Sequence, residues 1–166
     1  YNEMSAGKIE NALIAENQSK TGSAIYVKDT ANKNSTKITN TTITKNEDST
    51  STSSPVSASK TTNVIEIVNS IIAGNTRNQA ITASGVTVSY SLIGDDSKGR
   101  FYISKSNVQN TSISMDSIFK DVMNKNYQLK AGSFAVNKGN NSYVTRQEDL
   151  IGNDRIYKGT VDLGAY

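Results

Sequence analysis

A nine-residue phrase returns three times in this chain at a constant interval. Residues 9–17 read IENALIAEN, residues 38–46 read ITNTTITKN and residues 67–75 read IVNSIIAGN, so each copy begins 29 residues after the previous one. A degenerate fourth copy, VSYSLIGDD, spans residues 88–96 and begins 21 residues after the third. Repeats with a period of roughly 20–50 residues are typical of solenoids, whose units bury their apolar faces against one another. The interval therefore predicts a stack of similar units.

Four places of the phrase hold the same kind of residue in the first three copies. The first and sixth places are apolar, and the third and ninth places are asparagine. The residues are Ile9, Ile38 and Ile67 at the first place; Asn11, Asn40 and Asn69 at the third; Ile14, Ile43 and Ile72 at the sixth; and Asn17, Asn46 and Asn75 at the ninth. In the fourth copy Val88 and Ile93 are apolar, while Tyr90 and Asp96 replace the asparagines.

The sequence around the phrase favours strands over helices. It is rich in Thr, Val, Ile, Ser and Asn, and VIEIV at 64–68 alternates with period two, as does GVTVSYS at 85–91. Residues 47–54, EDSTSTSS, are expected to form a mobile loop. Further strands are expected at 23–27, 55–59, 79–83 and 101–104.

The spacing within the phrase predicts a corner in each unit. Ile72 follows Ile67 by five residues, an odd step, so a straight strand would point the two side chains to opposite faces. A turn at Asn69 would bring both into one interior, because asparagine tolerates the left-handed backbone conformation that such a corner needs. Stacking places the third-place asparagines about 4.8 Å apart, and we expect their amides to form a ladder.

The composition excludes several classes of function. The chain has no Cys and no His, so disulfides, thiol catalysis, a serine-type triad and the commonest zinc ligand are absent. The net charge is +3, but the basic residues are scattered among acidic ones, so we expect no nucleic-acid partner. No apolar run reaches the length of a membrane span, and there is no signal peptide. Since the chain starts with Tyr1, we expect a targeting segment upstream in a longer protein.

The repeat dissolves after about residue 99, and the remainder of the chain carries a different pattern. Residues 116–140 read DSIFKDVMNKNYQLKAGSFAVNKGN, and residues 149–166 read DLIGNDRIYKGTVDLGAY. These stretches resemble the choice-of-anchor Q domain, a module that often ends bacterial surface proteins with a pectin-lyase-like right-handed β-helix. Ser117 and Phe134 stand where that family usually has proline. The matching residues are Asp116 and Phe119; Asn126, Tyr127 and Leu129; Gly132, Ser133, Ala135, Val136, Asn137 and Gly139; Asp149, Gly152 and Arg155; and Asp162, Gly164, Ala165 and Tyr166.

The repeat, the strands and the corner predict an all-β, right-handed parallel β-helix of three to four rungs over residues 1–104, and the resemblance implies the same fold. Residues 105–166 would form a cap packed on the last rung as one structural unit. Within it Arg155 is expected to pair with Asp149 or Asp162. Its expected apolar cover consists of Phe119, Tyr127, Leu129, Phe134, Val136, Leu150, Ile151, Ile156, Val161 and Leu163.

Proteins of this fold include polysaccharide lyases and glycosidases, which need columns or pairs of carboxylates. Here the carboxylates of the repeat do not stack, because the place of Glu10 holds Thr39 and Val68 in the next copies. Asp95 and Asp96, beside Lys98 and Arg100, form the best charged cluster, whose composition is ordinary for a solvated turn. We therefore assign no catalytic, cofactor-binding or metal-binding residue, and no cofactor.

Two functions follow from these features. The first is the C-terminal part of an exported bacterial cell-surface protein, extracellular or at the cell surface, that acts as a structural and adhesive module without catalysis. The second is the tail of a carbohydrate-active β-helix enzyme whose active site lies upstream. A phage or fibre-like spike is a third option and would require trimer contacts.

Glycans are the partners expected in either case: a polysaccharide, or a glycan of the host or cell surface. Tyr26, Tyr90 and Tyr102 are candidates for stacking on sugar rings or for partly buried cover. N-x-S/T triplets, acceptors of N-glycans only in a eukaryotic secretory route, begin at Asn17, Asn34, Asn40, Asn110 and Asn140.

Overall fold

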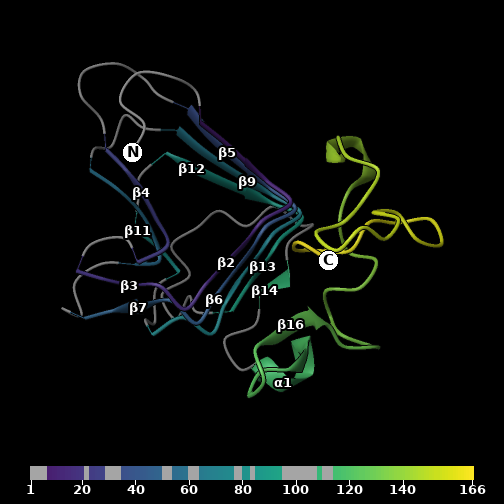
Figure 1. The fold of residues 1–166 in the computed structure, drawn as a ribbon. Coiled ribbons are helices and arrows are strands. Elements are labelled where there is room, and N and C mark those ends of the chain that lie inside the picture. The colour runs from purple at the N-terminus through teal and green to yellow at the C-terminus, as the bar shows by residue number, and fades with distance from the viewer. Residues whose placement is uncertain are drawn as a thin grey trace.

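The computed structural model describes residues 7–20, 23–28, 35–49, 54–59, 64–76, 80–82, 85–94, 108–109 and 114–166. These residues form an all-β structure built on three parallel sheets (Figure 1). The first sheet contains β1 (Gly7–Glu10), β5 (Ser35–Thr39), β9 (Val64–Val68) and β12 (Val86–Ser89). The second contains β2 (Leu13–Ala15), β6 (Thr42–Thr44), β10 (Ile71–Ala73), β13 (Leu92–Ile93) and β14 (Val108–Gln109). The third contains β4 (Ile25–Val27), β8 (Val56–Ala58) and β11 (Ile81–Thr82).

The copies of the phrase lie in register with one another across these sheets. In the first sheet Ile9 pairs with Ile38, Ile38 with Ile67, and Ile67 with Val88. In the second sheet Ile14, Ile43, Ile72 and Ile93 pair in the same order. Equivalent places of successive copies are therefore paired across the sheets. This arrangement is compatible with a β-helical solenoid. The second sheet also includes β14, which lies beyond the boundary expected at residue 104.

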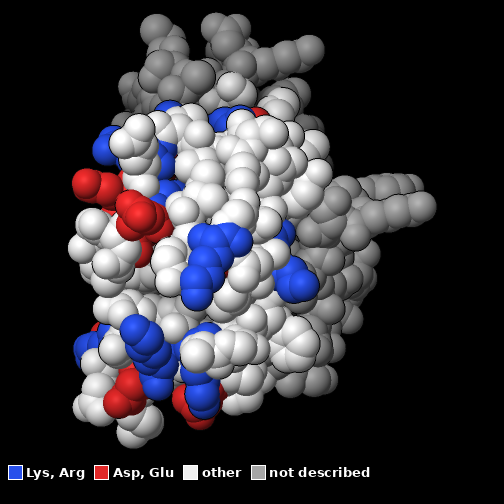
Figure 2. All heavy atoms as spheres, turned by 90° about the vertical axis from the view of Figure 1, so that its right-hand side faces the viewer, with Lys and Arg blue, Asp and Glu red and all other residues white. Residues whose placement is uncertain are grey.

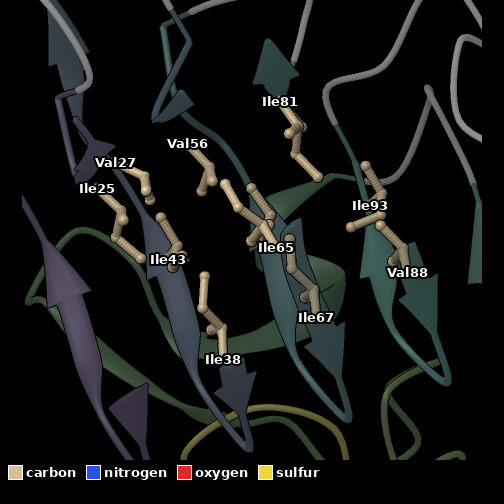
Figure 3. Packing of buried hydrophobic residues seen from close by; sticks show 12 residues of the cluster. Ile25, Val27, Ile38, Ile43, Val56, Ile65, Ile67, Ile81, Val88 and Ile93 are labelled. Carbon is tan, nitrogen blue, oxygen red and sulfur yellow. The ribbon is translucent and has the colours of Figure 1, made fainter. Parts of the chain in front are cut away.

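The corner predicted at the third place is present in all four copies. Asn11, Asn40 and Asn69 have φ angles of 54°, 47° and 50°, and Tyr90, which replaces asparagine in the fourth copy, has a φ of 47°. The corner separates the first sheet from the second. Side chains from both sheets therefore point into one interior, as Ile67 does in Figure 3 beside residues of the neighbouring strands.

A second corner, which the sequence analysis did not predict, follows at the eighth place. Glu16, Lys45 and Gly74 have φ angles of 60°, 54° and 69°. In the first two copies this corner leads into a pair of short parallel strands, β3 (Gln18–Ser19) and β7 (Glu47–Asp48). A side chain at position 74 would lie 2.4 Å from the sulfur of Met115, so the close approach of the C-terminal segment requires glycine there.

An asparagine ladder exists, but at the ninth place and not at the third. The Asn17 side-chain amide donates to Asn46 Oδ1 at 2.8 Å, and the Asn46 amide donates to Asn75 Oδ1 at 3.0 Å. The expected ladder of Asn11, Asn40 and Asn69 is therefore wrong. The left-handed corner turns these side chains away from the stack, so that Asn11 and Asn69 bond to the C-terminal segment instead.

A hydroxyl ladder runs beside it at the fourth place. The backbone N–H of Thr41 donates to the Ser70 hydroxyl at 3.2 Å, and the N–H of Ser70 donates to the Ser91 hydroxyl at 3.1 Å. All three residues are fully buried. Each hydrogen bond of the two ladders satisfies a polar group that the stack has removed from water. These bonds offset the free-energy cost of burying the polar residues.

The C-terminal segment, residues 114–166, covers the outer face of the second sheet. It contains α1 (Met115–Ile118), an antiparallel hairpin of β15 (Phe119–Asp121) and β16 (Asn126–Leu129), and the 3-10 turn η1 (Asn141–Tyr143). In Figure 1 it lies at one flank of the stacked strands. Its hydrophobic residues form a second core with the outward-facing residues of that sheet: Leu13, Ala15, Ile71, Ala73, Leu92, Ile118, Phe119, Tyr127, Ala135 and Leu163.

This position differs from the expected cap on the last rung. The segment contacts Asn11 of the first copy through Glu148 and Asn69 of the third copy through Asn140. Its backbone at Ala165 also donates to the Thr42 hydroxyl of the second copy at 3.0 Å. The segment therefore crosses the copies along the side of the stack. The C-terminal segment covers the outward-facing apolar residues of the second sheet.

Part of the expected apolar cover is exposed instead. Phe119, Val161 and Leu163 are buried, as expected. Ser133 and Ala135 are buried on either side of Phe134, which is 56% exposed, because this stretch is a turn in which the Val136 N–H donates to the Ser133 carbonyl oxygen at 3.1 Å. The other expected cover residues that are exposed are Leu150, Ile151 and Ile156.

Two predictions about loops and strands have partial outcomes. Glu47 and Asp48 belong to strand β7, so segment 47–54 begins as a strand, and Ser54 at its other end is buried outside any strand. Residues 50–53 and the strand expected at 101–104 lie outside the described residues.

Replacing Asn46 tests the ladder at the ninth place. Asn46→Ala removes an acceptor for Asn17 and leaves the carbonyls of Ile14 and Thr44 without their side-chain donor, so we expect a loss of about 2–4 kcal/mol in the free energy of unfolding. Asn17→Ala, at the exposed end of the ladder, should cost less than about 1 kcal/mol. Urea denaturation measures both losses. Equal losses for the two variants would contradict the ladder.

Candidate functional site

Glu10 in the first copy forms an ionic contact with the C-terminal segment. Its carboxylate lies 2.8 Å from Lys8 Nζ and 3.8 Å from Arg146 Nε, and it accepts a hydrogen bond from the Thr145 hydroxyl. Burial of the carboxyl acts to raise its pKa, but the hydrogen bonds from Lys8 and Thr145 and the two positive charges outweigh it, so the pKa is lowered. Glu10 therefore stays ionised and holds residues 145–146 against the first sheet.

Glu16, at the second corner, holds the hairpin in the same way. It forms an ion pair with Lys125, and the Tyr127 hydroxyl donates to its Oε1 at 2.8 Å. The bonds from Lys125 and Tyr127 lower the pKa of Glu16. Burial and the bond to Glu16 raise the pKa of Tyr127 to about 12. The second acidic residue of the first copy is thus also used to fix the C-terminal segment.

The register confirms that these carboxylates form no acidic column. Glu10 has Thr39 beside it on the neighbouring strand, and Thr39 has Val68 beside it in turn. Glu66 lies next to Lys37 and forms an ion pair with it at 3.2 Å. Among the described residues no group of three or more acidic side chains is placed to hold a metal ion. Glu10 and Glu66 therefore do not stack with other carboxylates on the neighbouring strands.

The three tyrosines proposed for sugar stacking have different environments. Tyr90 is half-buried, and its ring centroid lies 6.2 Å from that of Tyr143. The Tyr143 ring in turn has Lys37 Nζ 5.1 Å from its centroid. Tyr26 is 43% exposed on β4. Tyr102 lies outside the described residues. Tyr90 therefore serves as packing, and Tyr26 keeps an accessible ring.

The sequence candidates with charged or amide side chains are only partly described. The cluster at 95–100, including Asp95, Asp96, Lys98 and Arg100, lies outside the described residues, as do Asn34 and Asn110. Asn40 is fully buried, and its side chain forms no hydrogen bond with any described residue. Asn140 caps η1 by accepting from the N–H of Ser142 at 2.9 Å.

Arg155, Asp149 and Asp162 come together, but the contacts differ from a simple ion pair. Arg155 is 3% exposed and donates through Nη2 to the carbonyl oxygen of Asp162 at 2.6 Å. Burial lowers the pKa of Arg155, while the charges of Asp162 and Asp149 oppose that shift. Burial raises the pKa of Asp162, against the bond from the Asn137 N–H and the charge of Arg155. This arrangement orders the last turns of the chain and is structural.

A groove runs between the second corner of the first two copies and the hairpin. We call it the corner groove; its volume is about 460 Å³. One wall consists of residues at or after the second corner, and the other of residues of the hairpin. Its lining residues are Glu16, Asn17, Gln18, Lys45, Glu47, Val122, Met123, Lys125 and Tyr127.

The sequence analysis did not identify the corner groove as a site. It joins residues more than 100 positions apart, as the 111-residue separation of Tyr127 and Glu16 shows. One signal was present in the sequence: charged residues occupy the eighth place in Glu16 and Lys45, where the third copy has Gly74. Recognising it requires knowing that this place is a corner.

Charge on the face formed by the C-terminal segment is dispersed. Figure 2 shows Lys and Arg side chains interspersed with Asp and Glu on the part of this face that the structure describes, without a continuous basic area. Such a surface lacks the basic stripe that nucleic-acid binding requires. None of the helices among the described residues has the length and hydrophobicity needed to cross a lipid bilayer.

Comparison of the chain with protein-family models, with curated proteins and with solved structures gives no match.

The ionic contact at Glu16 should make stability depend on pH. Because the pKa of Glu16 is lowered in the folded state, its contribution is present above the ordinary glutamate pKa of about 4.3 and is lost as pH falls through the folded-state value. Wild type should therefore be more stable than Glu16→Gln at pH 7, and the difference should shrink as the pH falls below about 4.3. Urea denaturation across this range measures it.

The matched control is Glu148→Gln, because Glu148 contacts Asn11 through its backbone carbonyl and not through its carboxylate. The control should follow wild type at every pH. A Glu16→Gln difference that stays constant between pH 7 and pH 3 would refute the ionic contact.

Proposed function

We propose that this chain is a structural and adhesive module of an exported bacterial cell-surface protein with a right-handed parallel β-helix. Residues 114–166 would be its choice-of-anchor Q-like segment. The module has no catalytic activity of its own, and its partners are polysaccharides or glycans of the host or cell surface.

The use of the acidic side chains carries this proposal. Glu10 and Glu16 each bind a cation of the C-terminal segment, and Glu66 binds Lys37 on the neighbouring strand. Carboxylates used for catalysis would have their pKa tuned for proton transfer. Here the pKa of both Glu10 and Glu16 is lowered, which suits permanent ion pairs that hold two parts of the chain together.

Burial within the repeat supports a place in a longer solenoid. Ile38, Ile43, Ile67 and Ile72 have no exposed surface, whereas the equivalent residues of the first copy, such as Ile14, remain partly exposed. The Asn17 amide uses its donors on Asn46 and Ala15, which leaves its oxygen to accept from a further asparagine. A further copy with the same register would complete both the core and the ladder.

The position of the C-terminal segment along the side of the stack favours a rigid module. The C-terminal segment bonds to the first, second and third copies, so sliding one copy against another would break contacts with it. A stack clamped along its side in this way resists bending, which suits a stalk that presents a binding surface away from the cell.

The second candidate is the tail of a carbohydrate-active β-helix enzyme whose active site lies in upstream copies. The partly exposed first copy favours it to the same degree, because the same open end would accept the copies that hold a cleft. The two candidates differ in the upstream copies: an enzyme requires a column or pair of carboxylates there, with a nearby basic residue.

Incubation of the full-length protein with pectate, xylan and other plant and bacterial polysaccharides tests the absence of catalysis. We expect neither unsaturated uronates nor new reducing ends, and we expect antibodies to label the protein on intact cells of the bacterium that encodes it. Release of either product at a catalytic rate would replace the first candidate with the second. A strictly intracellular protein would contradict both.

A further inference from the structure

We propose that the corner groove binds a neutral oligosaccharide. The groove is formed by two parts of the chain that have no sequence relation: the second corner of the first two copies, and the β15–β16 hairpin of the C-terminal segment. The proposal goes beyond a structural role for the hairpin, because it assigns the space between hairpin and stack to a ligand. It rests on the proposed function only in the class of ligand.

Backbone strain is the first observation that points to this groove. Glu16 and Lys45 on one wall and Lys125 on the other all have a left-handed backbone, with φ angles of 60°, 54° and 59°. This conformation is unfavourable for residues other than glycine and asparagine, and it clusters at sites that clamp ligands. The three strained residues thus all present a charged side chain to one hollow.

The third copy shows what the same corner looks like without a groove. Gly74 occupies the eighth place there, and Met115 of α1 fills the space that a side chain would need. The groove is therefore confined to the first two copies. In these, glycine would be the residue of lowest strain, yet the chain has Glu16 and Lys45. Glu16 is accounted for by its contacts with Lys125 and Tyr127, whereas the fold supplies no such partner for Lys45 among the lining residues of the groove.

The charges in the groove balance. Glu16 forms an ion pair with Lys125, and the other two charged residues of the lining are Lys45 and Glu47, one of each sign. An acidic ligand such as a uronate would gain from Lys45 but be repelled by Glu47. A neutral ligand whose groups both donate and accept hydrogen bonds can use both, and sugar hydroxyls have this property.

The remaining lining suits the same ligand. Asn17 and Gln18 add amide groups, and Gln18 Nε2 donates to Glu47 Oε2 at 3.3 Å, which holds these two polar side chains together on one wall. Val122 and Met123 add apolar surface on the hairpin wall, and Met123 is 90% exposed. Oligosaccharides have apolar faces of C–H groups between their hydroxyls, so a wall of each kind fits them. The volume lies within the range of about 300–1,000 Å³ that small-molecule sites occupy.

Titration of the protein with defined hexasaccharides tests the proposal. The probes are cellohexaose, xylohexaose, mannohexaose and chitohexaose, with hexagalacturonate as the acidic comparison. The readout is the amide chemical shifts of the ¹⁵N-labelled protein. We expect at least one neutral hexasaccharide to shift residues 16–18, 45–47 and 122–127 together, and to bind more tightly than hexagalacturonate.

Two substitutions then separate binding from folding. Lys45→Gly removes the ammonium group at a position whose backbone glycine accepts without strain, and Glu47→Gln removes a charge while keeping the shape of the side chain. Each should weaken binding about tenfold or more, since each removes a hydrogen bond to a charged group. The matched control is Lys158→Gly, an exposed lysine outside the groove with a φ of 55°, which should leave the affinity unchanged.

Three results would overturn the proposal: no neutral probe shifts these residues at millimolar concentration, the shifts occur elsewhere on the protein, or hexagalacturonate binds most tightly. An equal loss of affinity in Lys158→Gly would do the same, because it would remove the groove from the explanation. The structural role of the module is tested separately by cell-surface labelling and the absence of polysaccharide cleavage, so either can fail without the other.

Discussion

A left-handed backbone conformation at the third place of each copy turns the chain from the first sheet into the second, and the rest of the structure depends on it. Asn11, Asn40, Asn69 and Tyr90 all adopt it. Without the turn, the odd step between the first and sixth places would send Ile67 and Ile72 to opposite faces; with it, both fill one core. A single backbone constraint, repeated every 29 residues in the first three copies, therefore sets both the register and the interior.

The same corner explains why the molecule has two cores. Residues that point inward at the sixth place leave the fifth and seventh places pointing outward, and in the third copy these are Ile71 and Ala73. They need cover, which the C-terminal segment supplies with Phe119 and Leu163. Hydrophobic contact alone would not fix where that segment lies along the stack, because the outer face repeats with the copies. The ion pairs of Glu10 and Glu16 with Arg146 and Lys125 distinguish the first copy from the others.

Sequence periodicity was sufficient for features that depend on local backbone, and insufficient for features that depend on which segment meets which. The strands, the corner at Asn69 and the absence of an acidic column followed from parity and alignment. The ladder was placed at the wrong asparagines because Asn69 and Asn75 look alike in sequence; only the corner at Gly74 makes the second one point along the stack. The sequence IIA at 71–73 already indicated that something covers the outer face of the second sheet, because a continuous apolar strand is buried on both faces. The signal for the corner groove, the charged residues Glu16 and Lys45 at the eighth place, can be recognised only once that place is known to be a corner and the hairpin is known to lie beside it.

Substitution at Asn40 measures the central claim most directly, because its buried side chain has no hydrogen-bond partner among the described residues and therefore contributes mainly through its backbone. Asn40→Gly keeps access to the left-handed conformation, and its free energy of unfolding should stay within about 1 kcal/mol of wild type. Asn40→Val, a β-branched residue for which this conformation is an outlier, should lose at least about 2 kcal/mol or fail to fold. If valine is tolerated as well as glycine, the corner does not require a left-handed residue, and the shared interior needs another explanation.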